Sequence, residues 1–293
     1  MRPPPALPLL LLVLLSRAPT AAAPPAPAAS AAAAPGAERW ASLPPEVREH
    51  LPERESALGL RERLLRNSAR FLETPYVLSP LGEGEGLDPD PTFRLDAVDC
   101  LTFVEQTLAL SLAHTQAEVA ALLERLRYAS EPRYEDRNHL MEAQWLPNNL
   151  RKGFLVDVTR RYGGADVERA EKALTDLTWS SRTSSALQLP RKRQPRGTFG
   201  LEIIPLAAVM AHARDVPSGT LLLVVREDKP LLPTRVKHLG FVVQKKKRTY
   251  LRHAARNGKY TSWRVAGVSL YEVRPQRGAP GSAPAQTATR PEP

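Results

Sequence analysis

Covalent chemistry in this sequence depends first on the thiol of Cys100, the single cysteine among 293 residues. Cys100 follows Asp99 and opens the apolar-periodic run CLTFVEQTLALSL, so the sequence predicts a helix over about 98–113. A thiol at a helix N-terminus meets the positive end of the helix dipole and unpaired backbone N–H groups. Both favour the thiolate, which is the reactive form. Because a disulfide within the chain needs a second cysteine, Cys100 is either a buried, inert thiol or a nucleophile.

Two of the six histidines are suited to serve such a nucleophile. His238 begins the apolar run HLGFVVQ, His253 lies near the end of TYLRHAA, and the charged segment KKKR separates the two runs. This pattern predicts a β-hairpin with a charged tip that brings the imidazoles together across the ladder. If the sheet packs on the Cys100 helix, one histidine can take the thiol proton and the other can orient it. The backbone N–H of Cys100 can then hold an oxyanion.

Two other functions fit these residues. Cys100, His238 and His253 are possible zinc ligands, and three protein ligands with one water would form a catalytic zinc site. The sequence has neither the H-E-x-x-H nor the C-x-x-C spacing that marks such sites, so we expect no metal and no other cofactor. The other alternative is a non-catalytic module that binds the cell wall through its basic clusters, with Cys100 merely buried.

The helices that must position Cys100 come early in the chain. Helices are predicted over 45–51 and 57–72, and a turn-rich loop, TPYVLSPLGEGEGLDPDP, leads on to Cys100. A further helix begins at Thr115 with a T-x-x-E capping box and runs to about Tyr128. The segment RYEDRNHLMEAQWLPNNL, here called the middle motif, has no clean period, and a short helix is predicted over 167–174.

The pattern changes after Phe199. The following β-branched or apolar runs are separated by turn residues and are typical of antiparallel strands: LEIIPL, GTLLLVV, HLGFVVQ, TYLRHAA and SLYEVR. Helices followed by an antiparallel sheet predict an α+β fold rather than alternating α/β.

Both ends of the chain differ in composition from the rest. Arg2, the apolar run ALPLLLLVLL and the small residues up to Ala23 are typical of a secretory signal peptide, predicted over 1–23. An Ala/Pro-rich disordered linker is predicted over 24–37, one folded domain over 38–274 and a disordered tail over 275–293. We therefore expect an exported protein, periplasmic or extracellular, without a transmembrane segment.

The charge balance favours anionic partners. The chain has 41 Lys and Arg against 31 Asp and Glu, a net charge of +10, and the excess is most visible in RKRQPR and KKKR. These clusters are either solvated loop faces or a means of attraction to cell-wall glycan, acidic lipid heads or nucleic acid. Export argues against nucleic acid as the partner. In addition, neither cluster alternates with aromatic residues, as a surface that binds single-stranded nucleic acid does.

Seven strings, occurring in one order, resemble the N-acetylmuramoyl-L-alanine amidase-like family of secreted bacterial proteins, a branch of the NlpC-type, papain-like cysteine peptidases. They are TPYVLSPLGEGEG, DAVDCLTFVEQTLALSL, LRYA, YEDRNHLMEAQWLPNN, VPSGTLLLVV, KHLGFVV and LRHAA. The resemblance spans about 58–273 and is most specific where D-C-L-T-F-V-E occurs together with R-N-H and H-L-G-F-V. It implies a papain-like α+β fold, with N-terminal helices packed on an antiparallel sheet.

The resemblance also implies roles for single residues. Cys100 would be the nucleophile, His238 the general base and His253 the polar residue that orients the base. Tyr76 of TPYVL resembles a tyrosine near the nucleophile that donates to the carbonyl oxygen. Asp99 matches the acidic residue before the cysteine, which we interpret as a helix cap.

The middle motif resembles the part of the family that supplies candidate substrate-binding residues. These are Arg137, Asn138, His139, Trp145, Asn148 and Asn149. The alternative is a loop held by asparagine caps and one buried tryptophan. One departure from the family pattern is Ala255, where a serine is frequent. It changes the hydrogen bonds expected around Cys100, His238 and His253 but not these three residues themselves.

The activity implied is hydrolysis of an amide bond in peptidoglycan or a muropeptide through a thioester, by a protein that we expect to be monomeric. Two bonds compete: the bond from the lactyl group of N-acetylmuramic acid to L-alanine, and the bond from γ-D-glutamate to the diamino acid. The family description favours the first.

Overall fold

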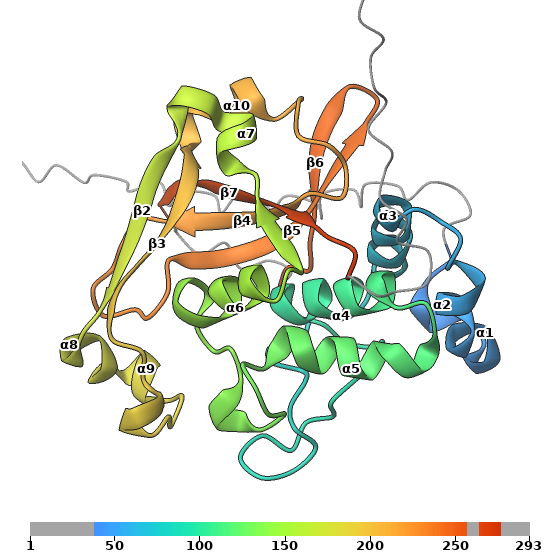
Figure 1. Ribbon diagram of the computed structural model, residues 1–293, viewed down its shortest axis with the longest axis horizontal. Helices are drawn as coiled ribbons and strands as arrows, with labels where there is room; N and C mark the ends of the chain where they lie inside the picture. Colours follow the sequence, from blue (N-terminus) through green and yellow to red (C-terminus); the bar gives the residue numbers. More distant parts are fainter. Residues whose placement is uncertain (1–37, 257–263, 277–293) are drawn as a thin grey trace, which may run out of the picture. The chain divides into compact units, whose positions relative to one another are not determined.

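The computed structural model describes residues 38–256 and 264–276 (Figure 1). All described residues belong to one compact unit, Gly36–Pro293. The predicted signal peptide and linker lie outside the described residues, as does the predicted tail from residue 277 onward. No helix in the described part of the chain is long and apolar enough to cross a membrane.

Helices dominate the first half of the described chain. Those before the first strand are η1 (Trp40–Ser42), α1 (Pro45–Glu49), α2 (Leu51–Arg54), α3 (Leu60–Arg70), α4 (Cys100–Leu112), α5 (Gln116–Arg127), η2 (Tyr134–Asp136), the π-helix η3 (Met141–Trp145) and α6 (Leu146–Arg151). Short helices between the strands are α7 (Thr159–Gly163), η4 (Gly164–Asp166), α8 (Asp176–Trp179), α9 (Arg182–Ser185), η5 (Arg191–Arg193) and α10 (Leu206–His212).

One antiparallel sheet forms the second half. Its strands are β1 (Leu155–Asp157), β2 (Glu168–Leu174), β3 (Gly197–Pro205), β4 (Leu221–Arg226), β5 (Val236–Lys245), β6 (Arg248–Arg252) and β7 (Val265–Val273). The strand order is β2-β3-β7-β4-β5-β6, and β1 pairs with β7. The mixed α+β fold predicted from the sequence is therefore confirmed.

Helices cover both faces of this sheet (Figure 1). α4 packs against β5 with α3 and α5 beside it, whereas α7 and α10 contact β3 and β7 on the opposite face. Successive side chains of a strand point to opposite faces. Accordingly Phe241 of β5 stacks edge-on against Phe103 of α4, while its neighbour Val242 joins a second apolar cluster with Ile204 and Val268.

The helix predictions around Cys100 are confirmed. The predicted helices 45–51 and 57–72 correspond to α1 with the start of α2 and to α3, and α4 begins at Cys100 itself. Thr115 is the N-cap of α5, and the Glu118 carboxylate accepts the backbone N–H groups of His114 and Thr115, as a capping box requires.

The predicted helix over 167–174 is wrong, because Glu168–Leu174 is strand β2 and pairs with β3 along its whole length. The segment is rich in helix-forming residues. However, its buried positions alternate, at Ala170, Lys172 and Leu174, as they do in a strand with one covered face. Pairing with β3 therefore overrides local helix propensity.

The predicted hairpin with a charged tip is confirmed. β5 and β6 pair from Lys245 opposite Arg248 to Phe241 opposite Arg252. Lys246 and Lys247 form the two-residue turn with φ values of 48° and 63°, and positive φ at both positions is the conformation that matches the twist of a tight hairpin.

Candidate active site

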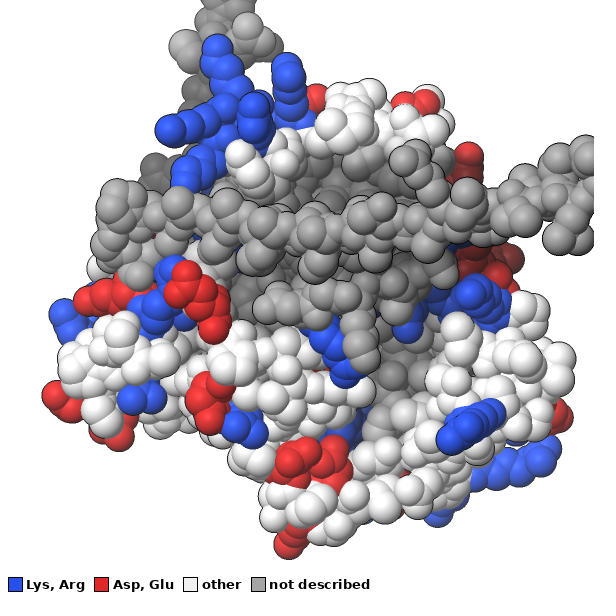
Figure 2. Space-filling view, turned by 180° about the vertical axis from the view of Figure 1, so that it is seen from behind, with Lys and Arg blue, Asp and Glu red and all other residues white. Residues whose placement is uncertain are grey.

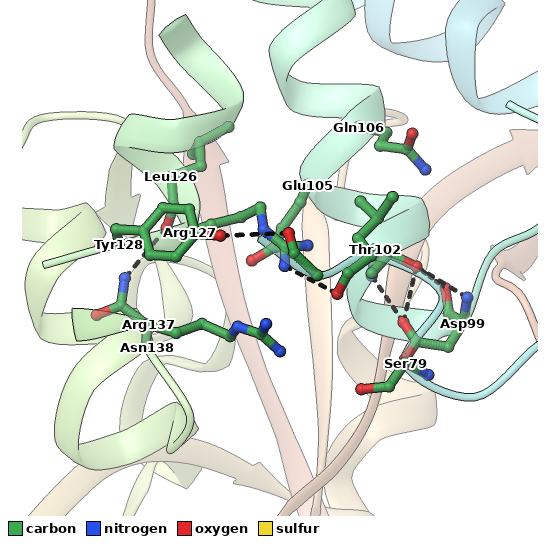
Figure 3. Close-up of polar contacts among 12 residues, drawn as sticks. Ser79, Asp99, Thr102, Glu105, Gln106, Leu126, Arg127, Tyr128, Arg137 and Asn138 are labelled. Atoms are coloured by element: carbon green, nitrogen blue, oxygen red, sulfur yellow. Dashed lines mark hydrogen bonds and ion pairs between the residues drawn. The ribbon is translucent and has the colours of Figure 1, made fainter. Parts of the chain in front are cut away.

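Cys100 is the first residue of α4, and Asp99 is the cap that starts this helix. The Asp99 carboxylate accepts the backbone N–H of Thr102 at 2.8 Å, and the Thr102 hydroxyl accepts the backbone N–H of Asp99 at 2.9 Å. The second carboxylate oxygen accepts the N–H of Ser79 at 3.0 Å, so the cap also holds the preceding loop (Figure 3). These bonds agree with the interpretation of Asp99 as a capping residue.

Tyr76 lies beside this helix start. A β-bridge pairs Tyr76 with Val98, two residues before Cys100. Burial, followed by the negative charges of Cys100 and Asp99, raises the pKa of the Tyr76 phenol to about 12. The phenol therefore stays protonated at neutral pH and is able to donate a hydrogen bond.

The Cys100 thiol differs from the sequence expectation. The backbone N–H groups of Cys100 and Leu101 do lower its pKa, as a helix N-terminus should. Burial and the Asp99 carboxylate outweigh them and raise the pKa to about 12. The expected thiolate is thus corrected to a protonated thiol at neutral pH, because the sequence pattern did not reveal how deeply the sulfur is buried.

His238 and His253 meet as the hairpin predicts. Nε2 of His238 lies 2.5 Å from Nδ1 of His253, and the rings are edge to face with centroids 4.6 Å apart. His238 is within β5, and His253 follows the last residue of β6. At such a contact one ring donates the proton and the other accepts it, so the orientation of each imidazole depends on its partner.

Gly240 permits this approach. It lies two residues after His238, and a Cβ atom there would come within 2.3 Å of the Arg252 carbonyl oxygen and 2.9 Å of the His253 Cβ. No side chain fits in that space, which explains sterically why H-L-G-F-V has glycine at this position.

Both histidines are neutral at neutral pH. Burial, then the charge of His253, lowers the pKa of His238 to about 4, and burial also lowers the pKa of His253. A neutral imidazole is the form that can accept a proton from a thiol.

Lys237 connects the start of β5 with Cys100, and sequence reasoning missed it. β4 and β5 are out of register here, with Val224 opposite His238 and Val225 opposite Val236, so Lys237 occupies a β-bulge. Burial lowers the pKa of Lys237, the Cys100 charge raises it, and Lys237 in turn lowers the pKa of Cys100. The residue before His238 is therefore within electrostatic reach of the sulfur. Its position next to His238 is the only feature of the sequence that could have pointed to it.

A cavity of about 470 Å³ lies beside these groups. Tyr76, His253 and Phe103 are among its lining residues, and Phe103 is one helical turn after Cys100 on α4. Arg256 also lines the cavity, with its guanidinium 5.8 Å from the centre of the Tyr76 ring. The cavity is thus lined by an aromatic ring, a phenol, an imidazole and a cation.

Several middle-motif residues bond to the protein beneath α4. The Glu105 carboxylate of α4 accepts Trp145 Nε1 at 2.9 Å. The same carboxylate pairs with Arg127 at 3.3 Å (Figure 3). Asn138 and Asn149 both donate to the carbonyl oxygen of Leu126 at the end of α5. Trp145 and Asn149 have no exposed surface, and Asn138 is 3% exposed.

The remaining middle-motif residues are also bonded within the fold. Asn148 donates to Asn138, and the His139 ring bonds the carbonyl oxygen of Tyr134. Arg137 forms ion pairs with Glu83 and Asp88. Among the described residues these side chains thus support the loops around α4 and α5. None of them lines the 470 Å³ cavity. Their bonds are those expected of a loop held by asparagine side chains and a buried tryptophan, rather than of a substrate groove.

Glu142 is a second residue that sequence reasoning missed. It is 4% exposed, and its carboxylate accepts the Thr234 hydroxyl at 2.6 Å and the backbone N–H groups of Arg235 at 2.5 Å and Val236 at 2.9 Å. The middle motif therefore holds the start of β5, two residues before His238. An acidic residue in an aperiodic segment was the only available signal.

Within the described residues, no three His, Cys, Asp or Glu side chains are grouped to hold a metal ion. The zinc alternative therefore gains no support from this geometry.

Comparison with protein families found one match. The family model described as N-acetylmuramoyl-L-alanine amidase-like (AmiA-like) matches residues 66–273. This range includes Cys100, His238 and His253, together with the whole middle motif. A search of curated proteins found no match.

Solved structures share the fold. Protein LPG0564 of Legionella pneumophila, from a family designated DUF1460, is 20% identical with a TM-score of 0.67, covering 79% of this chain and 94% of that one. An N-acetylmuramoyl-L-alanine amidase from Bacteroides uniformis is 22% identical with a TM-score of 0.59, covering 73% and 99%. A putative xylanase from Bacteroides fragilis is 20% identical with a TM-score of 0.55, covering 71% and 99%. At these identities the likeness shows the fold alone.

Proposed function

Because the chain belongs to the N-acetylmuramoyl-L-alanine amidase-like family, we propose that it hydrolyses an amide bond of peptidoglycan with Cys100 as its nucleophile. The observation that carries this proposal is the His238–His253 contact at one end of the hairpin, next to a cavity that Tyr76 and the Cys100 helix border. A nucleophile at a helix N-terminus and a histidine on an antiparallel strand also support assignment to the NlpC-type, papain-like branch.

The attack begins from a neutral pair. His238 uses Nε2 for its contact with His253, so Nδ1 is the nitrogen that takes the thiol proton as the sulfur attacks the carbonyl carbon. His253 keeps the ring of His238 oriented and stabilises the imidazolium that forms. The high pKa of Cys100 and the low pKa of His238 mean that the proton moves only as the carbon–sulfur bond forms.

The tetrahedral intermediate carries a negative oxygen. The backbone N–H of Cys100 and the phenol of Tyr76 are the donors that we assign to this oxyanion. As the intermediate collapses, the imidazolium of His238 gives its proton to the leaving amine and a thioester remains on Cys100. Water, deprotonated by His238, attacks the thioester, and the acid is released as the thiol regains its proton.

For the bond that is cut, we propose the one joining the lactyl group of N-acetylmuramic acid to L-alanine. The family description supports this choice. Arg256 in the cavity supplies a cation for a carboxylate of the peptide stem. We also propose that the protein acts after export, in the periplasm or outside the cell, since residues 1–23 have the pattern of a signal peptide.

The test is a digest of purified peptidoglycan with the products identified by mass spectrometry. New lactyl carboxyl groups and peptides beginning with free L-alanine establish the amidase, whereas new amines on the diamino acid establish the endopeptidase. His238→Ala should abolish cleavage, and His50→Ala, a change at an exposed histidine outside the site, should leave it intact. Equal cleavage by both variants would contradict the proposed base.

A further inference from the structure

A second, larger cavity lies on the sheet face opposite α4. Its volume is about 660 Å³. Val242 of β5 and Leu251 of β6 line it, although Phe241, next to Val242, packs against Phe103 of α4 on the other face. The proposed reaction uses none of the residues that line this cavity, so its role needs a separate explanation.

The walls are mostly apolar. The residues that line the cavity come from α10, from the β5–β6 hairpin and from β4 and β7. The aliphatic side chains that line it are Ile204, Val209, Val216, Leu222, Val242, Leu251, Val268 and Leu270. Pockets of about 300–1,000 Å³ with such walls are typical of sites for apolar ligands.

Large apolar side chains are exposed at the rim. Met210 of α10 is 81% exposed and Tyr250 of β6 is 40% exposed, and both line the cavity. Leu206, at the start of α10, is 54% exposed. A cluster of this kind is unfavourable in water unless another apolar surface covers it.

The same rim is cationic. Arg214, Lys247 and Arg248 line the cavity, and Lys246 completes the hairpin turn. Figure 2 shows Lys and Arg side chains gathered at its upper left, where the β5–β6 hairpin lies. Among the residues that the structure describes, none of these four forms an ion pair with a carboxylate.

The other basic cluster of the sequence behaves differently. Arg191 and Arg196 pair with Asp176, and Arg193 pairs with Asp136. Three of the four basic residues of RKRQPR therefore lie in ion pairs, whereas Arg214, Lys246, Lys247 and Arg248 form none among the described residues.

From these observations we propose that α10 and the β5–β6 hairpin dock on an anionic lipid membrane surface. The basic residues meet the phosphate headgroups, Met210 and Tyr250 enter the boundary with the acyl chains, and the cavity accepts one acyl chain. Charge complementarity favours this partner, because apolar side chains beside Lys and Arg are the combination that binds anionic bilayers. A polar glycan would form no hydrogen bonds with the apolar walls of the cavity.

The test is co-sedimentation of residues 24–293 with vesicles. This chain lacks the predicted signal peptide, which could itself insert, and it contains the whole compact unit Gly36–Pro293. Vesicles of phosphatidylcholine with phosphatidylglycerol are compared with vesicles of phosphatidylcholine alone. We expect at least about tenfold tighter binding to the anionic vesicles, weakened by salt.

Two variants and two matched controls locate the contact. Met210→Asp removes the exposed apolar contact, and the double change Lys247→Glu with Arg248→Glu reverses the charge at the tip. Each should weaken binding at least about tenfold. Leu177→Asp, at a residue of α8 that is 59% exposed and does not line the cavity, and Arg191→Glu, in the paired cluster, should bind as the unchanged protein does.

Three results would overturn the proposal. The first is no preference for anionic vesicles, and the second is an equal loss of vesicle binding in the variants and in their controls. The third is a protein that ignores vesicles but binds lipid-free sacculi through the same residues, which would assign the surface to the cell wall. Since none of these residues is part of the proposed catalytic site, hydrolysis of soluble muropeptides should be unchanged in every variant.

Discussion

Nε2 of His238 and Nδ1 of His253 lie 2.5 Å apart at one end of the β5–β6 hairpin, with their rings edge to face. Gly240 makes the contact sterically possible, because any larger residue would collide with the backbone of Arg252. The pair is held by a short hairpin rather than by a long loop, so its geometry is a property of local strand pairing. Such a rigid pair is suited to a base that must keep one ring orientation.

Removing the partner of the base should slow chemistry more than binding. We expect His253→Ala to reduce kcat by about 100-fold with little change in KM, because the ring of His238 loses the contact that orients it. His253→Asn keeps a polar partner and should lose less. Steady-state kinetics on a soluble muropeptide measure both, and equal kcat for the two variants would contradict an orienting role.

The acid limb of the activity profile should lie well below that of an ordinary histidine. The pKa of His238 is lowered to about 4, so the base remains neutral in mildly acidic solution. We expect kcat/KM to be nearly constant from pH 7 to about pH 5 and to fall as the pH approaches 4. A limb centred near pH 6.5 would show that His238 is not the titrating base.

The same shift makes stability depend on pH. Between about pH 6.5 and 4 the unfolded chain binds a proton at residue 238 that the folded chain does not, so lowering the pH destabilises the fold. His238→Gln should remove up to about 2 kcal/mol of the stability lost between pH 7 and 4.5, as measured by denaturant unfolding. Identical pH dependence in both proteins would contradict the lowered pKa.

Alkylation should detect the charges around the sulfur. Asp99→Asn retains a good helix cap but removes the carboxylate that raises the pKa of Cys100, so iodoacetamide should react several-fold faster at pH 8. Lys237→Gln removes a charge that lowers this pKa, so the reaction should slow. Changes in the same direction would mean that packing rather than charge controls the thiol.

Glu142 should act as a positioning residue. Its carboxylate holds the hydroxyl of Thr234 and two backbone N–H groups at the start of β5. We expect Glu142→Gln to destabilise the fold by about 1–3 kcal/mol and to lower kcat while KM changes little. Glu202→Gln, the same change at an exposed pair with Arg160, is the control for charge removal alone. If Glu142→Gln lost stability but its folded fraction kept an unchanged kcat, the role of Glu142 would be structural only.

Much of the site was predictable because its parts are local in sequence. The Cys100 helix, its Asp99 cap and the hairpin that joins His238 to His253 depend on patterns of a few residues. The pKa of Cys100 was not predictable, because burial by other elements outweighs the helix terminus. The strand at 168–174 was mistaken for a helix for a similar reason, since β3 decides its conformation. The contacts of Glu142 with Val236 and of Asn149 with Leu126 join residues far apart in sequence, which no local pattern reveals.

The most direct measurement is the mass of the protein during turnover. A muropeptide is mixed with the enzyme, the reaction is quenched in acid, and the intact chain and its peptides are weighed. We expect an acyl adduct on the peptide that contains Cys100, removed by hydroxylamine as a thioester should be, and neither adduct nor product with Cys100→Ala. Hydrolysis by Cys100→Ala at the rate of the unchanged protein would contradict the cysteine mechanism.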